Sequence, residues 1–256
     1  MHPGAITSYI DVAQLTLYAF WIFFAALVLW IRREDKREGF PLVSDLPGRV
    51  PLEEGAFMPA PKSFLMQDGS VILAPRAEAP EAEPYASPIA AFPGAPLEPL
   101  GDPMLAGVGP GSWAQRADVP ERLWETGAPK IVPLRADHEF SIPAEDPDPR
   151  GLPVIGLDGL VAGTCVDAWV DRSETIIRYL EIELTGAHVV LVPMTFATIG
   201  GNPRRIRVKS ILSTQFANVP TLAHPEQITK LEEDKVSAYY GGGWLYATAE
   251  RSEPLI

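Results

Sequence analysis

Residues 12–31 read VAQLTLYAFWIFFAALVLWI, an apolar stretch that contains no charged side chain. At a rise of about 1.5 Å per residue, a helix of this length covers roughly 30 Å, the thickness of the hydrocarbon core of a bilayer. A helix also satisfies its own backbone hydrogen bonds, which a segment exposed to lipid must do. The stretch therefore predicts a single membrane-spanning helix over residues 12–31, preceded by residues 1–11.

Two observations separate this helix from a cleaved signal peptide or a buried helix of a soluble protein. A signal peptide starts with a basic segment and ends at a small-residue cleavage site. Here no Lys or Arg precedes the stretch, and Arg32 and Arg33 follow it directly. Trp21 lies within it and Trp30 near its end, where indole rings favour the membrane interface. Both tryptophans are expected to contact lipid or a partner subunit.

Basic side chains gather on the C-terminal side of the predicted helix. Four of them follow it closely: Arg32, Arg33, Lys36 and Arg37. Since positive residues remain on the cytoplasmic side, the N-terminus is expected to face away from the cytoplasm and the rest of the chain to lie in it. The basic residues are expected to meet lipid headgroups, whereas the acids interleaved with them, such as Glu34, predict contacts with protein.

The composition excludes several classes of function. With 33 acidic and 21 basic residues the chain carries a net charge of -12, whereas a nucleic-acid partner requires a basic surface. The single cysteine, Cys165, cannot form an internal disulfide, and it lies in an apolar run that predicts an inert buried thiol. Phosphate-binding loops, nucleophile elbows, HExxH and CxxC motifs are absent from the sequence. We therefore expect a protein that is not an enzyme and binds neither metal nor nucleic acid.

Residues 32–153 form a long segment rich in proline. Of the 27 prolines in the chain, 21 lie between Pro41 and Pro153, which argues against long helices and central strands there. Apolar residues recur throughout, and SFLMQ followed by DG and SVILAP predicts a short β-hairpin. The segment is interpreted as an extended ribbon ordered on a partner surface, with a free linker as the alternative.

Short apolar runs separated by turn residues follow over residues 154–247. IIRYLEIEL shows the pattern best, because Glu181 and Glu183 alternate with aliphatic residues. The pattern predicts four to six strands of a small antiparallel sheet or barrel. PEQITKLEEDKVSAYYGGGWLYA then predicts one helix near residues 226–241 that ends at the glycines, and residues 248–256 form a tail.

The most unusual polar cluster is WVDRSE, which contains Asp171, Arg172 and Glu174 and is followed by Arg178. One interpretation is a solvated hairpin turn whose ion pairs contribute little. The other is a pair of carboxylates that relays protons beside a redox site on a partner, because burial raises the pKa of a carboxylate toward the range that proton transfer needs. The spacing does not separate the two interpretations.

Several blocks of residues stand in a fixed order over nearly the whole chain. They are residues 11–42, PKSFLM (61–66), GDPMLAGVGPGSWAQRADVP (101–120), KIVPLR (130–135), DPRGLPV (148–154), WVDRSE with RYLEIEL (169–184), and QFANVP followed by EEDKVSAYYGGGWLYA. In this order they resemble the H subunit of the photosynthetic reaction centre of purple bacteria. The resemblance implies one transmembrane helix beside the L and M subunits and a PRC-barrel domain that caps them, a small antiparallel barrel with one C-terminal helix.

The resemblance also implies a setting for the chain. It places the protein in a bacterial inner or intracytoplasmic photosynthetic membrane, with residues 1–11 in the periplasm. The chain itself is expected to bind no cofactor, whereas the complex carries bacteriochlorophyll, bacteriopheophytin, quinones, non-haem iron and carotenoid. A light-harvesting ring and a bound cytochrome subunit can belong to the same complex.

Roles for the polar cluster follow from the same resemblance. In the family, acids and an arginine at this turn belong to the network that delivers protons to the secondary quinone, and they carry over here as Asp171, Glu174 and Arg178. Some members place a histidine pair in the loop before the KIVPLR block, where this chain reads ERLWETGAP and offers Glu125 as an acceptor. The alternative function is a membrane-anchored PRC-barrel adaptor that binds a soluble partner.

Overall fold

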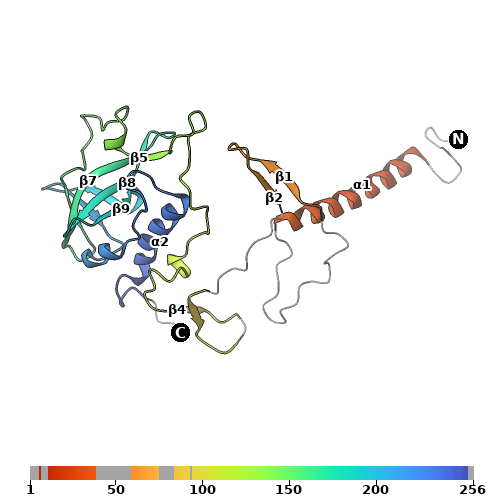
Figure 1. Cartoon of the computed structure of the whole chain (residues 1–256). Coiled ribbons are helices and arrows are strands. Elements are labelled where there is room, and N and C mark those ends of the chain that lie inside the picture. Colours follow the sequence, from red (N-terminus) through yellow and green to blue (C-terminus); the bar gives the residue numbers. More distant parts are fainter. Residues whose placement is uncertain (1–5, 7–10, 39–58, 75–83, 93, 253–256) are drawn as a thin grey trace. The chain divides into compact units, whose positions relative to one another are not determined.

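The computed structural model describes residues 6, 11–38, 59–74, 84–92 and 94–252. The chain forms two compact units: the first comprises residues 1–82 and 90–95, and the second comprises residues 83–89 and 96–256. The first unit contains the apolar helix, and the second contains the large sheet and the C-terminal helix (Figure 1).

An apolar helix dominates the first unit. α1 (Val12–Asp35) has 24 residues, and the side chain of Asp11 caps it by accepting a hydrogen bond from the backbone N–H of Gln14 at 2.7 Å. None of its side chains is buried, and it is long and apolar enough to cross a membrane. The predicted helix is confirmed. It continues about one turn beyond Ile31 because arginine and glutamate are good helix formers, and the 3-10 helix η1 (Lys36–Glu38) follows it.

A β-hairpin belongs to the same unit, as the sequence predicted. β1 (Lys62–Leu65) pairs antiparallel with β2 (Val71–Ala74), and Gly69 takes a positive φ of 80° in the turn between them. The hairpin is attached to the end of the apolar helix. The Lys62 ammonium lies 2.7 Å from a carboxylate oxygen of Glu34, and the Arg37 guanidinium donates to the carbonyl oxygen of Ala60 at 3.0 Å.

The second unit is built on a seven-stranded sheet. Its strands are β5 (Ile131–Pro133), β6 (Pro153–Ile155), β7 (Val161–Asp171), β8 (Ile176–Leu184), β9 (Val189–Pro193), β10 (Ala197–Gly200) and β11 (Arg205–Val208). They are hydrogen-bonded in the order β10-β11-β6-β7-β8-β9, and β5 pairs with β7. The predicted mainly-β domain is confirmed. The sheet nevertheless exceeds the predicted four to six strands and contains one parallel pair, β11 with β6.

The additional strand comes from the proline-rich segment, so the second unit does not begin at residue 154 as expected. Met104, Ile131 and Leu134 of that segment are buried in the same core as the sheet. Proline is compatible with a strand end, and β5 ends at Pro133. The remaining elements of this unit are short: β3 (Ala86–Pro88) paired with β4 (Leu97–Pro99), η2 (Gly109–Gly111), η3 (Leu134–Ala136), η4 (Met194–Phe196) and η5 (Ser213–Asn218).

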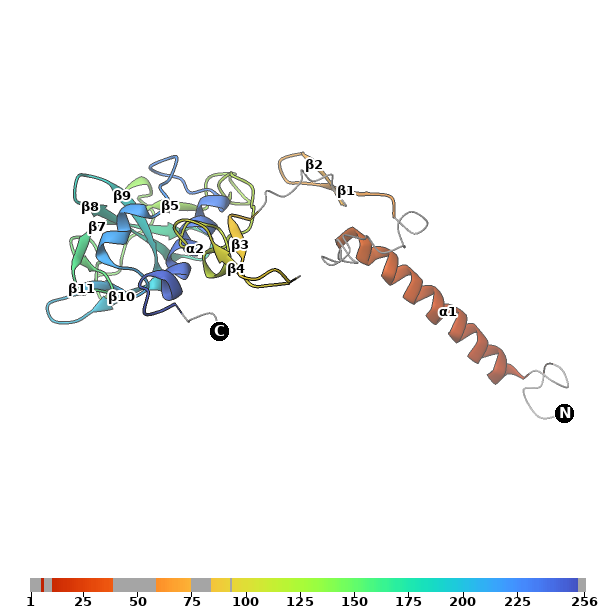
Figure 2. The same ribbon diagram turned by 90° about the horizontal axis from the view of Figure 1, so that it is seen from below.

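The C-terminal helix α2 (Lys230–Tyr246) lies beside the sheet (Figures 1 and 2). It starts later than the predicted residue 226 because Thr229 forms a capping box with Glu232. The Thr229 hydroxyl accepts a hydrogen bond from the Glu232 N–H at 3.1 Å, and the Glu232 carboxylate accepts one from the Thr229 N–H at 2.8 Å. Tyr239 and Tyr240 of α2 are buried in one core with strand residues such as Leu180.

The helix also continues through Gly241, Gly242 and Gly243, where the sequence predicted its end. These glycines allow close approach of neighbouring backbone. A Cβ atom at Gly243 would lie 2.5 Å from the carbonyl oxygen of Ser210, and one at Gly242 would lie 3.2 Å from the Cα atom of Gly111. Tertiary packing therefore outweighs the helix cost of each glycine, which is about 1 kcal/mol.

Replacing Gly243 by Ala should destabilise the second unit, because the new methyl group would overlap the Ser210 carbonyl oxygen. We expect the free energy of unfolding to fall by about 2 kcal/mol, the usual range for overpacking. Gly241→Ala is the matched control, since a Cβ atom there meets the Pro110 carbonyl oxygen at 3.4 Å, an ordinary contact. Urea unfolding of the full chain in detergent, followed by circular dichroism, measures both. Equal stabilities of the two variants would contradict the packing argument.

Candidate functional site

The turn between β7 and β8 is organised by a buried carboxylate. Asp171, the last residue of β7, has no exposed surface, and its Oδ1 atom accepts hydrogen bonds from the backbone N–H groups of Ser173 at 2.9 Å and Glu174 at 3.1 Å. Aspartate commonly holds turns through such side-chain to backbone bonds. These two bonds place the Glu174 backbone directly beside Asp171.

Lys130 brings a positive charge to this turn. It directly precedes β5, which pairs with the end of β7, so Ile131 lies opposite Asp171 in the sheet. The Lys130 ammonium lies 3.4 Å from the Oδ2 atom of Asp171, 3.6 Å from a carboxylate oxygen of Glu121 and 4.0 Å from one of Glu174. Burial lowers the pKa of Lys130, but the negative charges of Asp171 and Glu121 more than offset it and raise the pKa above its usual value.

Arg178 completes the group from the start of β8. Its guanidinium lies 4.0 Å from the Oδ2 atom of Asp171 and 3.9 Å from a carboxylate oxygen of Glu174. We name the five residues Glu121, Lys130, Asp171, Glu174 and Arg178 the charge network. Exposure is graded within it, because the side chain of Asp171 is fully buried whereas that of Glu174 is 53% exposed. The network therefore connects solvent to a buried carboxylate.

The structure brings together three of the four predicted proton-network residues. Asp171, Glu174 and Arg178 lie in the charge network, whereas Glu125 is exposed and makes no ion pair or hydrogen bond within the described residues. Arg172, which lies in the same turn, contacts Asp137 instead, at 2.6 Å. Lys130 and Glu121 were missed because their approach depends on the pairing of β5 with β7. The run KIVPLR was the available signal, since it places a lysine at the start of a short apolar strand.

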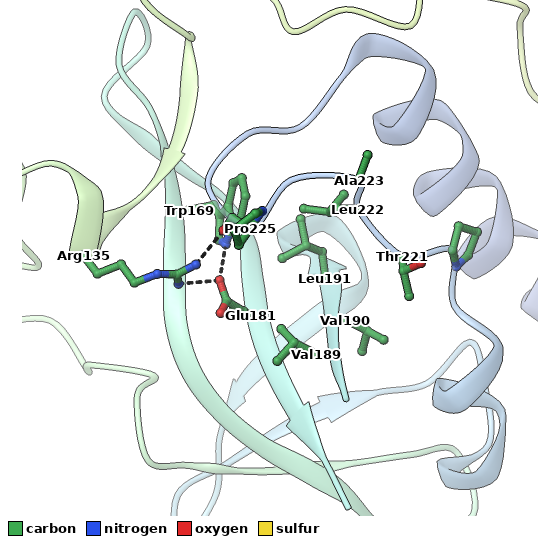
Figure 3. Close-up of a pocket in the computed structure, with 11 residues that line it drawn as sticks. Arg135, Trp169, Glu181, Val189, Val190, Leu191, Thr221, Leu222, Ala223 and Pro225 are labelled. Carbon is green, nitrogen blue, oxygen red and sulfur yellow. Dashed lines mark hydrogen bonds and ion pairs between the residues drawn. The ribbon is translucent and has the colours of Figure 1, made fainter. Parts of the chain in front are cut away.

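A second group of charges lies in the middle of β7 and β8, where the sequence did not predict one. Alternation along β8 predicts equal exposure of Glu181 and Glu183, but Glu183 is exposed and Glu181 is only 6% exposed. The buried carboxylate accepts hydrogen bonds from the Arg135 guanidinium and from the Trp169 indole N–H, each at 2.7 Å (Figure 3). The same guanidinium nitrogen of Arg135 reaches Asp167 at 3.1 Å.

These internal partners neutralise the second group and tie several segments together. Arg135 also donates to the carbonyl oxygen of Pro225 at 2.6 Å, which joins η3 to the loop before α2. A pocket of about 250 Å³ opens beside Arg135, Trp169 and Glu181, and its remaining walls are largely aliphatic and proline side chains of residues 189–191 and 220–225 (Figure 3). Since each charge already has a partner inside the chain, this group stabilises the fold.

The single cysteine, Cys165, offers no reactive thiol. Cys165 is fully buried in β7, and burial raises the pKa of its thiol to about 12, so the thiol stays protonated and inert, as expected. Within the part of the chain that the structure describes, no group of three or more His, Cys, Asp or Glu side chains is placed to hold a metal ion.

The residues predicted at the membrane interface lie along α1, at its C-terminal end and in η1. Trp21 and Trp30 are exposed on the helix. Arg32 and Arg33 occupy its last turn, and Lys36 and Arg37 belong to η1. Among the interleaved acids, Glu34 pairs with Arg37 and with Lys62 of the hairpin. The expected protein contact of these acids therefore includes the ribbon that follows in the same chain, and contacts with lipid or partner subunits remain predictions.

A helix long and apolar enough to span a membrane, followed by a mainly-β domain with a charged turn, defines the class of β-domain proteins with a candidate membrane helix. Two family models match this chain. The model of the photosynthetic reaction centre H-chain N-terminal region matches residues 4–136, and the model of the PRC-barrel domain matches residues 144–214.

The chain belongs to the family of photosynthetic reaction-centre H chains. The sheet of the second unit is accordingly a PRC-barrel domain. H chains are structural subunits of a membrane-associated photosynthetic complex, which fits the expectation of a protein that is not an enzyme and binds no pigment itself.

Replacing Glu181 by Ala should destabilise the barrel, because it leaves the buried Trp169 N–H without an acceptor and removes a partner of Arg135. Hydrogen bonds to charged groups are worth about 1.5–3 kcal/mol each, so we expect the free energy of unfolding to fall by about 3 kcal/mol. Glu183→Ala, two residues along the same strand and exposed, should change it by less than about 0.5 kcal/mol. Urea unfolding of the full chain measures both, and similar losses would contradict the assignment.

Proposed function

We propose that this H subunit caps the L and M subunits of the reaction centre on the cytoplasmic side, supports the quinone sites there and delivers protons to the secondary quinone. The observation that carries proton delivery is the charge network, in which a half-exposed carboxylate, Glu174, lies beside a fully buried one, Asp171. The bacteriochlorophyll, bacteriopheophytin, quinones, non-haem iron and carotenoid of the complex belong to the partner subunits in this proposal.

The chemistry of quinone reduction supports a network of this composition. A quinone that accepts two electrons also takes up two protons, so its site needs acids that pass protons from water. The Glu174 side chain is half exposed, which supports its role as the acceptor of a proton from solvent, and its backbone N–H donates a hydrogen bond to Asp171. Lys130 and Arg178 lie within 4.0 Å of both carboxylates. Their positive charges would compensate the negative charge that reduction adds to the quinone.

The first unit supports a role in capping a larger membrane assembly. The helix α1 supplies the anchor, and the basic residues at its C-terminal end favour a cytoplasmic second unit by the positive-inside rule. The hairpin beside it is apolar on both faces. Phe64 and Ile72 are exposed on one face, and Leu65, Val71 and Leu73 on the other.

An isolated two-stranded hairpin is only marginally stable in water, and a contiguous exposed apolar surface marks an interaction site. Its attachment to the helix end through Lys62 and Arg37 keeps this apolar surface at the membrane boundary. We infer that the cytoplasmic faces of transmembrane partner subunits cover the hairpin. The same surface would be left in water on an adaptor that works without such subunits.

Glu174→Gln in the complete reaction centre should slow the proton-coupled second electron transfer to the secondary quinone by about tenfold, because the variant cannot bind and release a proton. The first electron transfer and the assembly of the complex should not change. Glu183→Gln is the matched control, since this exposed carboxylate lies outside the charge network. Flash-induced absorbance spectroscopy measures both steps, and wild-type kinetics of Glu174→Gln would refute the role of Glu174.

A hairpin variant tests the capping role separately. Leu65→Asp combined with Leu73→Asp places two charges on one apolar face, and each would have to be desolvated against a partner. We expect the yield of pigmented L and M subunits that co-purify with the tagged chain in mild detergent to fall at least about tenfold. Leu160→Asp, in the turn before β7, is the control, since the exposure of this leucine lies between those of Leu65 and Leu73. A colourless wild-type preparation would instead favour the adaptor function.

A further inference from the structure

A buried acid on α2 lies outside the charge network. Glu233 in the first turns of the helix is 7% exposed, and the Tyr179 hydroxyl of β8 donates a hydrogen bond to its Oε2 atom at 3.1 Å. Its neighbours behave differently, because Glu232 caps the helix and Asp234 pairs with Arg116. Among the ion pairs of the described residues none includes Glu233. A phenol is therefore its direct partner, and that bond does not neutralise a negative charge.

The environment of Glu233 favours its protonated form. Burial raises the pKa of this carboxyl, and the hydrogen bond from Tyr179 and the charges of Arg116 and Arg178 offset the rise only in part. The negative charge of Glu121 acts in the same direction as burial. Tyr179 itself keeps its proton, because burial and the neighbouring Glu233 raise the pKa of its phenol, and Ser237 on α2 is its further hydrogen-bonding partner.

Two charges act on both Glu233 and the charge network. Arg178 pairs with Asp171 and Glu174, and Glu121 pairs with Lys130. The positive charge of Arg178 lowers the pKa of Glu233, and the negative charge of Glu121 raises it. The pKa of Glu233 therefore depends on the charges of two residues of the network.

We propose that Glu233 is a further proton-binding residue of the H subunit, a buried reservoir whose proton exchanges with water according to the charge state of the network at the β7–β8 turn. Positive charge that arrives near the network weakens the hold of Glu233 on its own proton, which then leaves as the carboxylate forms. Negative charge that arrives near the network has the opposite effect, and Glu233 takes up a proton. This inference deepens the proposed role in proton delivery and rests on it for its biological use.

The proton on Glu233 can be tested in the full chain without the rest of the complex. Infrared spectroscopy of the chain with labelled glutamate carboxyl groups should detect a protonated carboxyl band at pH values well above 4.5, the ordinary pKa of glutamate. Glu233→Gln should remove this band, and Glu183→Gln should retain it. A band that survives in Glu233→Gln, or its absence in the wild type, would overturn the proposal.

Two variants of opposite sign test the coupling. Arg178→Gln removes a positive charge and should raise the midpoint of the band by about half a pH unit, whereas Glu121→Gln removes a negative charge and should lower it by a similar amount. Unchanged midpoints in both variants would overturn the coupling. The quinone kinetics of Glu174→Gln are measured in the complete complex, so failure of that role and failure of this inference are separate results.

Stability against pH gives a second measurement on the same chain. The pKa of Glu233 is raised in the folded state, so its contribution to stability is fully present below the unfolded pKa and is lost as the pH rises through the folded pKa. Glu233→Gln should remove that loss and unfold at a higher urea concentration than the wild type at alkaline pH. An identical pH dependence of the two proteins would contradict the assignment.

Discussion

The antiparallel pairing of β7 with β8 carries both groups of charges in the barrel. The two backbones approach closely near the beginning of β7, where a Cβ atom at Gly163 would lie 2.3 Å from the carbonyl oxygen of Glu183. In the middle of the ladder Asp167 stands opposite Glu181, and at its end Asp171 begins the turn. β5 then adds to the other side of β7 and brings Lys130 and Arg135 to these two places. The positions of Lys130 and Arg135 thus follow from one strand pairing, whereas Arg178 belongs to β8 itself.

Three of the buried acids of this domain, Asp171, Glu181 and Glu233, have three different kinds of partner, and the partner decides what each acid can do. Glu181 is bound by a guanidinium and an indole N–H, so its charge is satisfied and it holds the fold. Asp171 has turn amides and a lysine, and it lies next to a carboxylate that reaches solvent. Glu233 has a phenol, which leaves the cost of burying its charge largely in place and favours the bound proton. Burial is common to all three, and the compensating charge differs.

In the second unit charged groups are buried, whereas in the first unit apolar side chains are exposed. No other part of the described chain covers them. α1 has no buried side chain, and the strands of the hairpin present apolar residues on both faces. Such surfaces are stable in a membrane or against protein, and the hydrophobic effect supplies the free energy for both. The intrachain contacts of Glu34 and Arg37 with the hairpin region are polar and position it without covering its apolar residues.

The sequence by itself determined the features that depend on local pattern. Four features could be predicted because each is encoded within a few neighbouring residues. They are the helix α1, the hairpin of β1 and β2, the strand β8 and the inert thiol of Cys165. The blocks shared with reaction-centre H chains identified the family. They also directed attention to the turn that contains Asp171 and Glu174.

Tertiary structure decided what depends on residues distant in sequence. The approach of Lys130 to Asp171 and of Arg135 to Glu181 requires the pairing of β5 with β7, which no local pattern in a proline-rich segment specifies. Continuation of α2 through three glycines requires the neighbouring backbone at Ser210 and Gly111. Burial of Glu181 and Glu233 was likewise not encoded locally. An acid on a strand or helix has the same sequence signal whether its face meets water or a partner, and the free energy of burying it depends on that partner.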